Sequence, residues 1–436
     1  MKERVHSTQL KQFIGKTAVA AGWVQDIRLM GGLKFLVVKD REGFFQITLP
    51  KKAVSAEIFA VPDKLTKESV VRVEGEVKAA VQAAGGYEII PARLEVVSLA
   101  GAPTPLDTSG KIESGLDARL DYRFLDLRNH KSIALFKLRA KMLKYVIDYF
   151  EQQGFIGINT PKLTSAGVES GAELFEVNYF GRKACLAQSP QIYKQMMVCA
   201  GFEKVYEIGA VYRAEKSQTT RHLTEFTGID FEMGFIDSFH DPMDVIEGMF
   251  RHVIAELNKN CAKELALFNR KPVVPKKIPR LSLDEAKKLL AAQGKKIPDG
   301  EDLDPEGERL IAKIVKEKFG EEFVFLTHYP WGKRPFYHMR PVDDPKVTLS
   351  FDLVWNGIEV STGAQREHRY EVLKAQAKEK GLDLDAMKDY ANLFKYGAPP
   401  HGGAGLGLDR FVECLLELDN IREGILLPRD PIRLTP

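Results

Sequence analysis

The sequence has few cysteines and no long apolar stretch. Its four cysteines are spread over 436 residues without a Cys-x-x-Cys pair, which argues against a disulfide framework or a zinc site and favours reduced thiols. No run approaches the 18 apolar residues that suggest a membrane span, and the N-terminus MKERVHSTQL lacks the apolar core of a signal peptide. We therefore expect a cytoplasmic protein that does not enter a membrane.

Strong charge, internal repeats and low-complexity tracts are also missing. The formal net charge of +3 is too small to argue for nucleic-acid binding by itself, although it permits a local basic face. At 44% hydrophobic and 28% charged residues the composition is that of a globular protein. The length exceeds what one hydrophobic core usually supports, so we expect two or more domains.

Residues 17–100 contain five β-rich runs separated by turn sequences such as DREG and AAGG. A polar, helix-prone stretch, AVSAEIFAVPDKL, separates the third run from the fourth. Five strands with a helix between the third and fourth suggest an OB-like barrel, a common reader of single-stranded nucleic acid. Another small β-barrel or a sandwich would produce the same pattern.

A stretch rich in Pro, Gly, Ser and Thr, GAPTPLDTSGK, marks a boundary after these strands. We predict an OB domain over residues 1–103, a link over 104–130 and a second domain over 131–436. The second domain opens with a long amphipathic helix, KSIALFKLRAKMLKYVIDYFEQQGF, that stops near Gly154. In the following INTPKL, Pro161 prevents full ladder bonding, which predicts a short strand at an edge or an interface.

The runs KVYEIGAVYRAE and TEFTGIDFEMGF predict a long antiparallel hairpin. In the second run apolar side chains such as Ile229 alternate with the acids Asp230 and Glu232, so the strand has one apolar and one acidic face. The hairpin also carries three charged residues and a histidine: Arg213, Glu215, Arg221 and His222. Arginines that converge with carboxylates suit a phosphate ester bearing an amine-rich base. Spacing alone favours a solvated ladder of salt bridges on a sheet face.

The segment SFDLVWNGIEVSTGAQREHR contains Asn356-Gly357, the strongest short signal for a two-residue type I′ hairpin turn. Such a turn predicts the pairs Trp355–Ile358, Val354–Glu359 and Asp352–Ser361. Asp352 and Glu359 then share one face as diagonal neighbours. Oxygen ligands so placed suit Mg²⁺ bound partly through substrate phosphates. Two exposed acids on an edge hairpin are an equally good interpretation.

In GAPPHGGAGLGLDRFVECLLEL a glycine-rich stretch runs into an apolar helix with Arg410 near its start. Glycines permit close approach of a ligand to the backbone, and a helix N-terminus favours anions. The stretch matches neither the P-loop nor the dinucleotide-binding pattern, so neither site is predicted.

In AQSPQIYKQMM, Ser189 and Pro190 predict the start of a helix, and Gln191 and Lys194 share one of its faces. A lysine about one turn inside a helix lies near the positive end of the helix dipole. A substrate carboxylate would satisfy both the lysine and the dipole. A solvated surface lysine is the alternative.

Together these stretches resemble the signature motifs of class II aminoacyl-tRNA synthetases. The long helix followed by Pro161 resembles motif 1, VYRAE…RHLTEFTGIDFEM resembles motif 2, and GLGLDR resembles motif 3. The preceding OB domain is typical of subclass IIb, which charges aspartate, asparagine or lysine. AQSPQIYKQ, AGVESGAELF and STGAQREHR resemble aspartyl-tRNA synthetases, and the ending PRDPIRLTP is similar to that of their compact archaeal type.

The resemblance implies a multidomain α+β fold: an anticodon-binding OB-fold β-barrel joined to a class II catalytic domain, whose antiparallel sheet is flanked by helices. It implies ATP and Mg²⁺ as cofactors, L-aspartate and tRNA(Asp) as substrates, and a homodimer formed through motif 1. Aspartate would attack the α-phosphate of ATP to give aspartyl-adenylate and pyrophosphate, and the tRNA 3′ end would then take the aspartyl group. Positioning and charge stabilisation suffice for this chemistry, so no general base is expected.

The resemblance also assigns residues. It makes Arg213, Arg410 and Glu359 catalytic. It places ATP, with its adenine on Phe226, against Arg213, Ala214, Glu215, Arg221, His222, Leu223, Phe226, Glu359, Gly407, Leu408, Asp409 and Arg410. It places aspartate against Glu169, Gln191, Ile192, Tyr193, Lys194, Arg213, Asp230, Thr362 and Arg366. It assigns Mg²⁺ to Asp352, Glu359 and Thr362, the last standing where aspartyl enzymes commonly carry serine.

The OB domain matches anticodon-contacting positions at Gln25, Phe35, Gln46, Ala84 and Glu88. Archaeal enzymes that charge only tRNA(Asp) tend to carry Trp at the position of Gln25 and Lys at that of Ala84. The absence of both favours an enzyme that also charges tRNA(Asn).

Two other functions fit parts of the sequence. An asparaginyl enzyme would have to accept a neutral amide, and a lysine aimed at that amide would be left as a buried unpaired cation. A non-catalytic tRNA-binding protein should lack a motif arginine or a metal carboxylate, yet all of these residues are present.

Overall fold

The computed structural model describes residues 4–165, 174–216 and 219–436. The chain divides into two compact units, Met1–Ala134 and Leu135–Pro436. The division falls inside helix α4 (His130–Gln152), which begins next to the predicted start of the second domain. The predicted domain limits themselves stay predictions.

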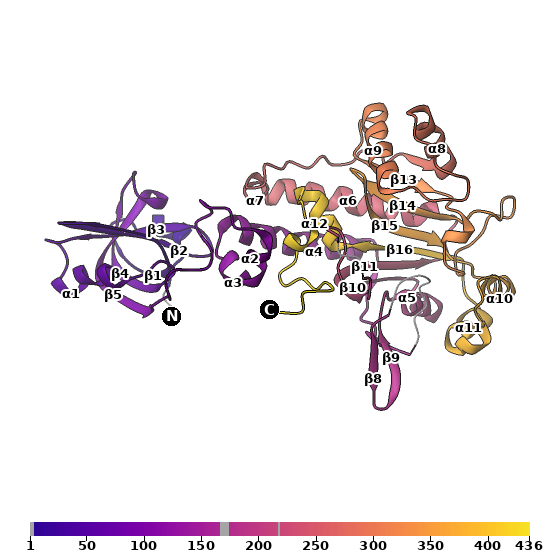
Figure 1. The fold of residues 1–436 in the computed structure, drawn as a ribbon, viewed down its shortest axis with the longest axis horizontal. Helices are drawn as coiled ribbons and strands as arrows, with labels where there is room; N and C mark the ends of the chain where they lie inside the picture. Colours follow the sequence, from indigo (N-terminus) through magenta and orange to yellow (C-terminus); the bar gives the residue numbers. More distant parts are fainter. Residues whose placement is uncertain (1–3, 166–173, 217–218) are drawn as a thin grey trace. The chain divides into compact units, whose positions relative to one another are not determined.

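The N-terminal unit is built on a closed five-stranded barrel, drawn in indigo in Figure 1. Its strand order is β1-β2-β3-β5-β4, and helix α1 (Ala56–Ala60) lies between β3 and β4, as the sequence predicted for an OB fold. The strands are β1 (Thr17–Met30), β2 (Leu33–Lys39), β3 (Phe44–Pro50), β4 (Val70–Ala79) and β5 (Tyr87–Ser98). Short 3₁₀ turns are η1 (Ser7–Phe13), η2 (Val61–Lys64) and η3 (Ala84–Gly86).

The segment that follows the barrel is held to it by buried charges. It contains helices α2 (Leu116–Asp121) and α3 (Arg123–Asp126). Glu68, after η2, accepts from Lys39 Nζ at 2.6 Å and from Arg128 Nη1 at 2.9 Å, and Thr108 donates to the same carboxylate. These donors outweigh the burial of Glu68 and lower its pKa. Because Thr108 and Arg128 belong to the segment predicted as a link, that segment packs as part of the N-terminal unit.

The C-terminal unit contains a mixed sheet of eight strands in the order β12-β13-β14-β15-β16-β11-β10-β6. The strands are β6 (Ile156–Gly157), β10 (Lys204–Tyr212), β11 (Glu225–Gly234), β12 (Arg280–Ser282), β13 (Phe323–Thr327), β14 (Ser350–Trp355), β15 (Ile358–Gln365) and β16 (His401–Gly407). A separate small sheet, of order β7-β9-β8, consists of β7 (Leu163–Thr164), β8 (Glu176–Tyr179) and β9 (Arg182–Leu186).

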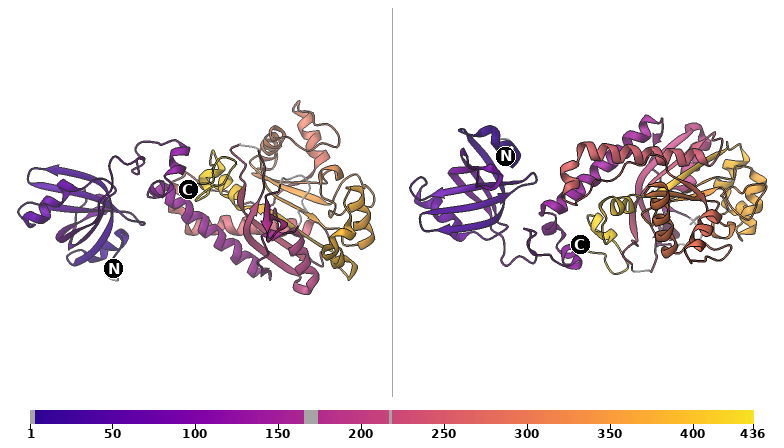
Figure 2. Two further views of the ribbon diagram at one scale, coloured as in Figure 1. Left: turned by 60° about the horizontal axis from the view of Figure 1, so that its bottom comes forward. Right: turned by 90° about the horizontal axis from the view of Figure 1, so that it is seen from above.

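Helices surround the large sheet (Figures 1 and 2). They are α5 (Gln191–Met197), α6 (His240–Asn260), α7 (Ala262–Ala266), α8 (Leu283–Ala292), α9 (Pro305–Phe319), α10 (Tyr370–Glu379), α11 (Lys388–Lys395) and α12 (Leu408–Leu416). Shorter turns are η4 (Val198–Phe202), η5 (Trp331–Lys333), η6 (Leu384–Met387) and η7 (Ile421–Gly424). Among the residues that the structure describes, no helix is both long enough and apolar enough to cross a membrane.

Both predicted hairpins form. Strands β10 and β11 pair over their length, with Glu207 opposite Asp230. Between β14 and β15, Asn356 and Gly357 have φ values of 48° and 82°, as a type I′ turn requires. The predicted pair Asp352–Ser361 is wrong, because a β-bulge shifts the register and Asp352 lies opposite Thr362. The extra residue on β15 is Val360.

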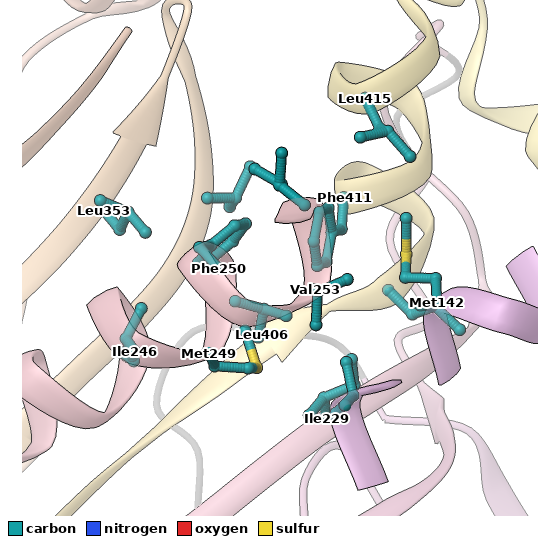
Figure 3. Packing of buried hydrophobic residues seen from close by; sticks show 14 of the residues in the cluster. Met142, Ile229, Ile246, Met249, Phe250, Val253, Leu353, Leu406, Phe411 and Leu415 are labelled. Carbon is teal, nitrogen blue, oxygen red and sulfur yellow. The ribbon is translucent and has the colours of Figure 1, made fainter. Parts of the chain in front are cut away.

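The main core lies on one face of the large sheet. Ile229 of β11 contributes to it together with α4, α6 and α12, and Figure 3 shows this packing around Phe250, Val253 and Phe411. Asp230 and Glu232 alternate with the core residues along β11 and therefore point to the opposite face. That face carries the site.

Candidate active site

A cavity of about 330 Å³ opens on the sheet face opposite the core. Its walls come from α5, β11, β15 and β16, from the loop after β10 and from the segment 333–338. Of the residues predicted from sequence, those lining the cavity are Gln191, Lys194, Arg213, Glu215, Arg221, His222, Leu223, Phe226, Asp230, Glu359, Thr362, Arg366, Gly407, Asp409 and Arg410. Residues separated by up to 219 positions in the chain, Gln191 and Arg410, thus meet in one site.

One end of the cavity is built from two buried cations and two buried carboxylates, which we call the paired-charge end: Lys194, Asp230, Glu232 and Arg366. Lys194 Nζ donates to Asp230 Oδ1 at 2.9 Å and to the carbonyl oxygen of Ala404 at 3.2 Å. Its side chain is 2% exposed, so the alternative of a solvated surface lysine is wrong. Lys194 is also not an isolated cation at a helix dipole, because carboxylates of the chain already balance its charge.

Glu232 joins the two cations. Arg366 Nε donates to Glu232 Oε1 at 2.9 Å and Arg366 Nη2 to Oε2 at 3.2 Å, while Lys194 Nζ lies 3.6 Å from Oε2. Burial favours the neutral acid, but Arg366 and Lys194 outweigh it and lower the pKa of Glu232. The formal charges of the paired-charge end therefore sum to zero.

Gln191 lies beside these charges at the start of α5. Its Oε1 accepts from Arg366 Nη2 at 3.3 Å, and its buried Nε2 makes no hydrogen bond within the described part of the chain. The helix begins at Gln191, one residue later than expected from Ser189 as N-cap and Pro190 as the first helical residue: Pro190 is the N-cap, and Ser189 Oγ accepts from the N–H of Gln191 at 3.3 Å. The helix period turns Ile192 toward the cluster around Phe336, away from the cavity.

The other end of the cavity, which we call the arginine end, combines Arg213, Phe226, His222, Glu359 and Arg410. Arg213 stacks over the ring of Phe226, with 5.2 Å between the guanidinium carbon and the ring centroid. His222 Nδ1 lies 2.5 Å from Thr219 Oγ1. Arg410 Nη1 donates to the carbonyl oxygen of Glu359 at 2.8 Å and is 3.7 Å from its Oε1. Guanidinium groups beside an aromatic face, one exposed (Arg213) and one half-buried (Arg410), suit a planar base bearing phosphates.

The bulge in β15 brings the predicted metal residues together. Thr362 lies opposite Asp352 and its hydroxyl donates to Glu359 Oε1 at 3.0 Å. Asp352 Oδ2 accepts from Arg334 Nη2 at 2.6 Å, whereas its buried Oδ1 has no partner among the described residues. Burial raises the pKa of Asp352 to about 6, with Glu359 adding to the rise and Arg334 opposing it. In the described part of the chain no three or more His, Cys, Asp or Glu side chains cluster closely enough to hold a metal alone.

The glycine-rich segment before Arg410 forms strand β16, which runs directly into helix α12 as the sequence predicted. A Cβ atom on Gly403 would lie 2.1 Å from the carbonyl oxygen of Phe231 and 2.5 Å from Glu232 Oε2. Glycine is therefore required here so that β16 can pass beside Glu232. The carbonyl oxygen of Gly403 also accepts from Arg366 Nη2 at 3.1 Å.

Comparison with known proteins agrees with this geometry. A family model described as class II tRNA synthetases (D, K and N) matches residues 115–431, and one described as an OB-fold nucleic acid binding domain matches residues 18–97. The first match covers well over half of the chain. The chain belongs to the class II tRNA synthetases.

Relatives of similar length fall within the same family. The aspartate–tRNA(Asp) ligase of Pyrococcus abyssi is 47% identical over 97% of both chains. The aspartate–tRNA(Asp/Asn) ligase of Aeropyrum pernix is 46% identical over 98% of this chain and 97% of that one. Among solved structures, asparaginyl-tRNA synthetase from Pyrococcus horikoshii complexed with asparaginyl-adenylate has a TM-score of 0.93 at 33% identity and full coverage of both chains. A putative aspartyl-tRNA synthetase from Leishmania major Friedlin has a TM-score of 0.91 at 31% identity, over 99% of this chain and 95% of that one.

Some residues that the family resemblance assigned to ligands have other surroundings in this class II synthetase. Side chains that do not line the cavity are Ala214, Ile192, Tyr193, Asp352 and Leu408, the last being fully buried in the core. Asp409 lines the cavity, but its carboxylate accepts hydrogen bonds from Arg139 Nη1 at 2.5 Å and from the N–H of Thr227 at 2.9 Å. Asp409 thus joins the motif 1 helix, the motif 2 strand and the motif 3 helix. Glu169 lies outside the described residues.

Three cavity-side residues had no role in the sequence analysis. Glu232 was placed on the acidic face of its strand, but its pairing with Arg366 could not be inferred without the tertiary fold. Arg334 and His338 come from a segment between β13 and β14 that contains no synthetase motif. A sequence signal was available for Arg334, because a basic residue is expected near two predicted metal carboxylates.

Three of the predicted anticodon residues of the synthetase, Phe35, Gln46 and Glu88, lie on the neighbouring strands β2, β3 and β5. Gln46 pairs with Glu88 between β3 and β5, and Phe35 on β2 lies opposite Thr48, whose hydroxyl donates to Glu88 Oε2 at 2.5 Å. Gln25 occupies a bulge in β1, where the register shifts between Val24 and Asp26, and Ala84 begins η3 between β4 and β5. OB folds commonly bind oligonucleotides on this strand face and at these loops. The anticodon contacts stay predictions.

Proposed function

We propose that this synthetase activates L-aspartate with ATP, forming aspartyl-adenylate and pyrophosphate, and then transfers the aspartyl group to the 3′ end of tRNA(Asp). The observation that carries the proposal is the paired-charge end, where Lys194 and Asp230 form an ion pair 2.9 Å long beside Arg366. Its charges are opposite to those of the substrate: Asp230 suits the ammonium group, and Lys194 with Arg366 suits the side-chain carboxylate. The aspartate ligases at 46–47% identity support the same choice.

Binding would exchange ionic partners inside the site. Aspartate would separate Lys194 from Asp230 and form one new pair with each, so that no buried charge is left alone. At the arginine end, Phe226 would stack on adenine while Arg213 and Arg410 hold the phosphates. The arginines would stabilise charge that develops at the α-phosphate, and the common cavity would bring the α-carboxylate close to it. No protein nucleophile takes part.

We further propose Mg²⁺ as a cofactor, held by Asp352, Glu359 and Thr362. The donors are hard oxygen atoms, and the buried Asp352 Oδ1, which has no partner among the described residues, could accept a cation as its partner. Three protein oxygens leave positions for water and for phosphate oxygens, as is usual for Mg²⁺. When bound, the ion would neutralise phosphate charge. The residues' own part is to fix its place, with Arg334 holding the second oxygen of Asp352 at 2.6 Å.

Asparagine is the main competing substrate, because the likeness to asparaginyl enzymes is strong in structure. In the free site Lys194 is paired with Asp230, so asparagine would strand the lysine only when the substrate ammonium takes Asp230 from it. Hydrogen-bond direction still favours aspartate: a carboxylate accepts from both Lys194 and Arg366, whereas an amide NH₂ facing either of them has only donors to meet. Pyrophosphate exchange with each amino acid tests the choice, and exchange driven by asparagine but not by aspartate would contradict it. Binding of tRNA without formation of any adenylate would instead identify a non-catalytic protein.

We propose tRNA(Asn) as a second acceptor. Several relatives, including that of Aeropyrum pernix, are named as ligases for both tRNAs. Gln25 and Ala84 stand in place of the Trp and Lys of strict enzymes, which supports relaxed recognition. Aminoacylation of tRNA(Asp) and tRNA(Asn) transcripts side by side is the test, and charging of tRNA(Asp) alone would refute this part of the proposal.

We also propose a cytoplasmic homodimer. The motif 1 helix α4 leads to β6, the end strand of the large sheet, where Ile156 is exposed and available to a partner. All four cysteines are free thiols, which suits a reducing compartment. Light scattering on the eluted protein should give the mass of a dimer, and a monomer mass at assay concentration would contradict the dimer.

A further inference from the structure

His338 is placed next to Arg366 by the backbone. The two residues face each other in an isolated antiparallel bridge, and the N–H of Met339 donates to the carbonyl oxygen of Gln365 at 3.0 Å. From the other side, Gln376 Nε2 of α10 donates to the carbonyl oxygen of His338 at 3.1 Å. Neighbours in such a bridge have adjacent side chains. The position of the imidazole is therefore fixed by two flanking elements.

The imidazole accepts a hydrogen bond from the substrate-facing arginine. Arg366 Nη1 donates to His338 Nε2 at 3.2 Å. His338 is 3% exposed, and burial together with the nearby charges of Arg366 and Arg334 lowers its pKa well below its usual value. The ring is therefore neutral, its Nε2 carries the lone pair and its Nδ1 carries the proton. Nδ1 is buried and has no partner among the described residues.

A neutral acceptor serves this position better than the alternatives. Glu232 already places one carboxylate on Arg366, at 2.9 Å. A second carboxylate would reverse the local charge and repel the carboxylate of a substrate. An apolar side chain would leave the Nη1 edge without this acceptor, in a buried site where an unmade hydrogen bond is costly. Imidazole orients the guanidinium and leaves its charge available.

We propose that His338 is a positioning residue of the amino-acid site, which orients the Nη1 edge of Arg366 so that the guanidinium receives the side-chain carboxylate of the substrate. The proposal rests on the proposed aspartate activation. His338 thereby contributes to the preference for a carboxylate over an amide, since a misdirected guanidinium distinguishes the two less well.

The test compares variants of His338 in the full-length protein by pyrophosphate exchange. H338F keeps a planar ring but lacks the acceptor. H338Q retains a side-chain oxygen able to accept from Arg366, and H338N has a shorter amide that does not reach it. The matched control is H240F, because His240 Nδ1 lies 3.1 Å from Arg280 Nη1 in an exposed His–Arg pair outside the cavity.

We expect H338F and H338N to raise the KM for aspartate by about tenfold, in line with the loss of one buried hydrogen bond to a charged group. The KM for ATP and kcat should stay within about threefold, and the preference for aspartate over asparagine should fall by about the same tenfold factor. H338Q should return the aspartate KM to within about threefold of the wild type. H240F should leave every parameter unchanged.

An aspartate KM unchanged in both H338F and H338N would overturn the role of His338. So would equal changes in the aspartate KM, the ATP KM and kcat, or an H338Q variant no better than H338F, since these indicate a general structural effect. Thermal melting of each variant identifies any that fails to fold, and H338N then replaces H338F. Wild-type protein that does not activate aspartate would refute the proposed function, whereas an active wild type with a silent H338F refutes only this inference.

Discussion

The substitution Lys194→Met removes the ammonium group from the paired-charge end while keeping a long apolar side chain. In the free protein the substitution removes two contacts of Lys194 Nζ, one with Asp230 Oδ1 at 2.9 Å and one with Glu232 Oε2 at 3.6 Å. Glu232 keeps its two hydrogen bonds with Arg366, so Asp230 is the carboxylate that loses most. In the proposed complex, the substrate carboxylate would lose one of its two cationic partners.

The magnitude follows from this exchange of partners. A charge-assisted hydrogen bond in a desolvated site is worth about 2–4 kcal/mol. Because wild-type binding would also break the Lys194–Asp230 pair, we expect the net loss to lie at the lower limit, about 2 kcal/mol, which corresponds to an increase of about 30-fold in the KM for aspartate. The fold is affected separately: stranding the buried Asp230 should lower the free energy of unfolding by about 3 kcal/mol.

Pyrophosphate exchange at varied aspartate and at varied ATP separates the two effects, and thermal melting follows stability. Lys162→Met is the matched control. Lys162 Nζ pairs at 2.7 Å with the buried Glu207, which lies on β10 of the same sheet, and neither residue lines the cavity. The control should lose stability with little change in either KM. In the double variant K194M/D230N stability should partly recover, because the stranded charge is gone, while aspartate binding stays weak.

Three results would refute this reasoning. An aspartate KM within threefold of the wild type for K194M would show that the lysine does not meet the substrate. An equal increase for K162M would show that any broken ion pair on this sheet disturbs the site. A larger increase in the KM for ATP than in that for aspartate would place Lys194 at the arginine end instead.

Three further perturbations test other parts of the molecule. Phe226→Ala should raise the KM for ATP by about tenfold, because stacking of an aromatic side chain on a base is worth about 1–3 kcal/mol. Phe226→Tyr keeps the aromatic ring and should not raise this KM, so equal KM values for ATP in the two variants would exclude adenine stacking. Arg139→Met leaves the buried carboxylate of Asp409 without its cation and should lower the free energy of unfolding by about 3–5 kcal/mol. The melting temperature measures this loss, and an unchanged melting temperature would contradict the structural role of the pair. Phe35→Ala should raise the KM for tRNA(Asp) by about tenfold and leave pyrophosphate exchange without tRNA intact, whereas equal losses in both assays would argue against an anticodon contact.

Much of the fold could be predicted because its signals are local. The strands of the barrel are short alternating runs bounded by turn residues, and the helix between the third and fourth strands has its own composition. Asn356-Gly357 specifies its turn by backbone preference alone. The alternation along β11 identified the acidic face that carries the site. Each of these features depends on residues close together in the chain.

What could not be predicted depends on contacts between distant segments. The bulge at Val360 changes the partner of Asp352 from Ser361 to Thr362. The sequence of β15 contains no signal that predicts this bulge. The segment after the barrel is rich in turn residues, which predicted a link. It nevertheless packs on the barrel, because Arg128 donates a hydrogen bond to Glu68, 60 positions earlier. The same holds at the cavity, where His338 meets Arg366 only because two loops form a bridge.

The charge balance of the paired-charge end determines how the substrate can be recognised. Because the formal charges of the paired-charge end sum to zero, this end adds no net attraction for an anion, and its discrimination has to come from contacts of hydrogen-bond length. In the free site Lys194 is already placed to contact a substrate carboxylate, and Asp230 is already placed to contact a substrate ammonium group. A ligand that supplies both charges replaces this ion pair without leaving a buried charge alone, whereas a ligand lacking one of them strands Lys194 or Asp230. Discrimination between amino acids would therefore follow from the cost of an incomplete exchange.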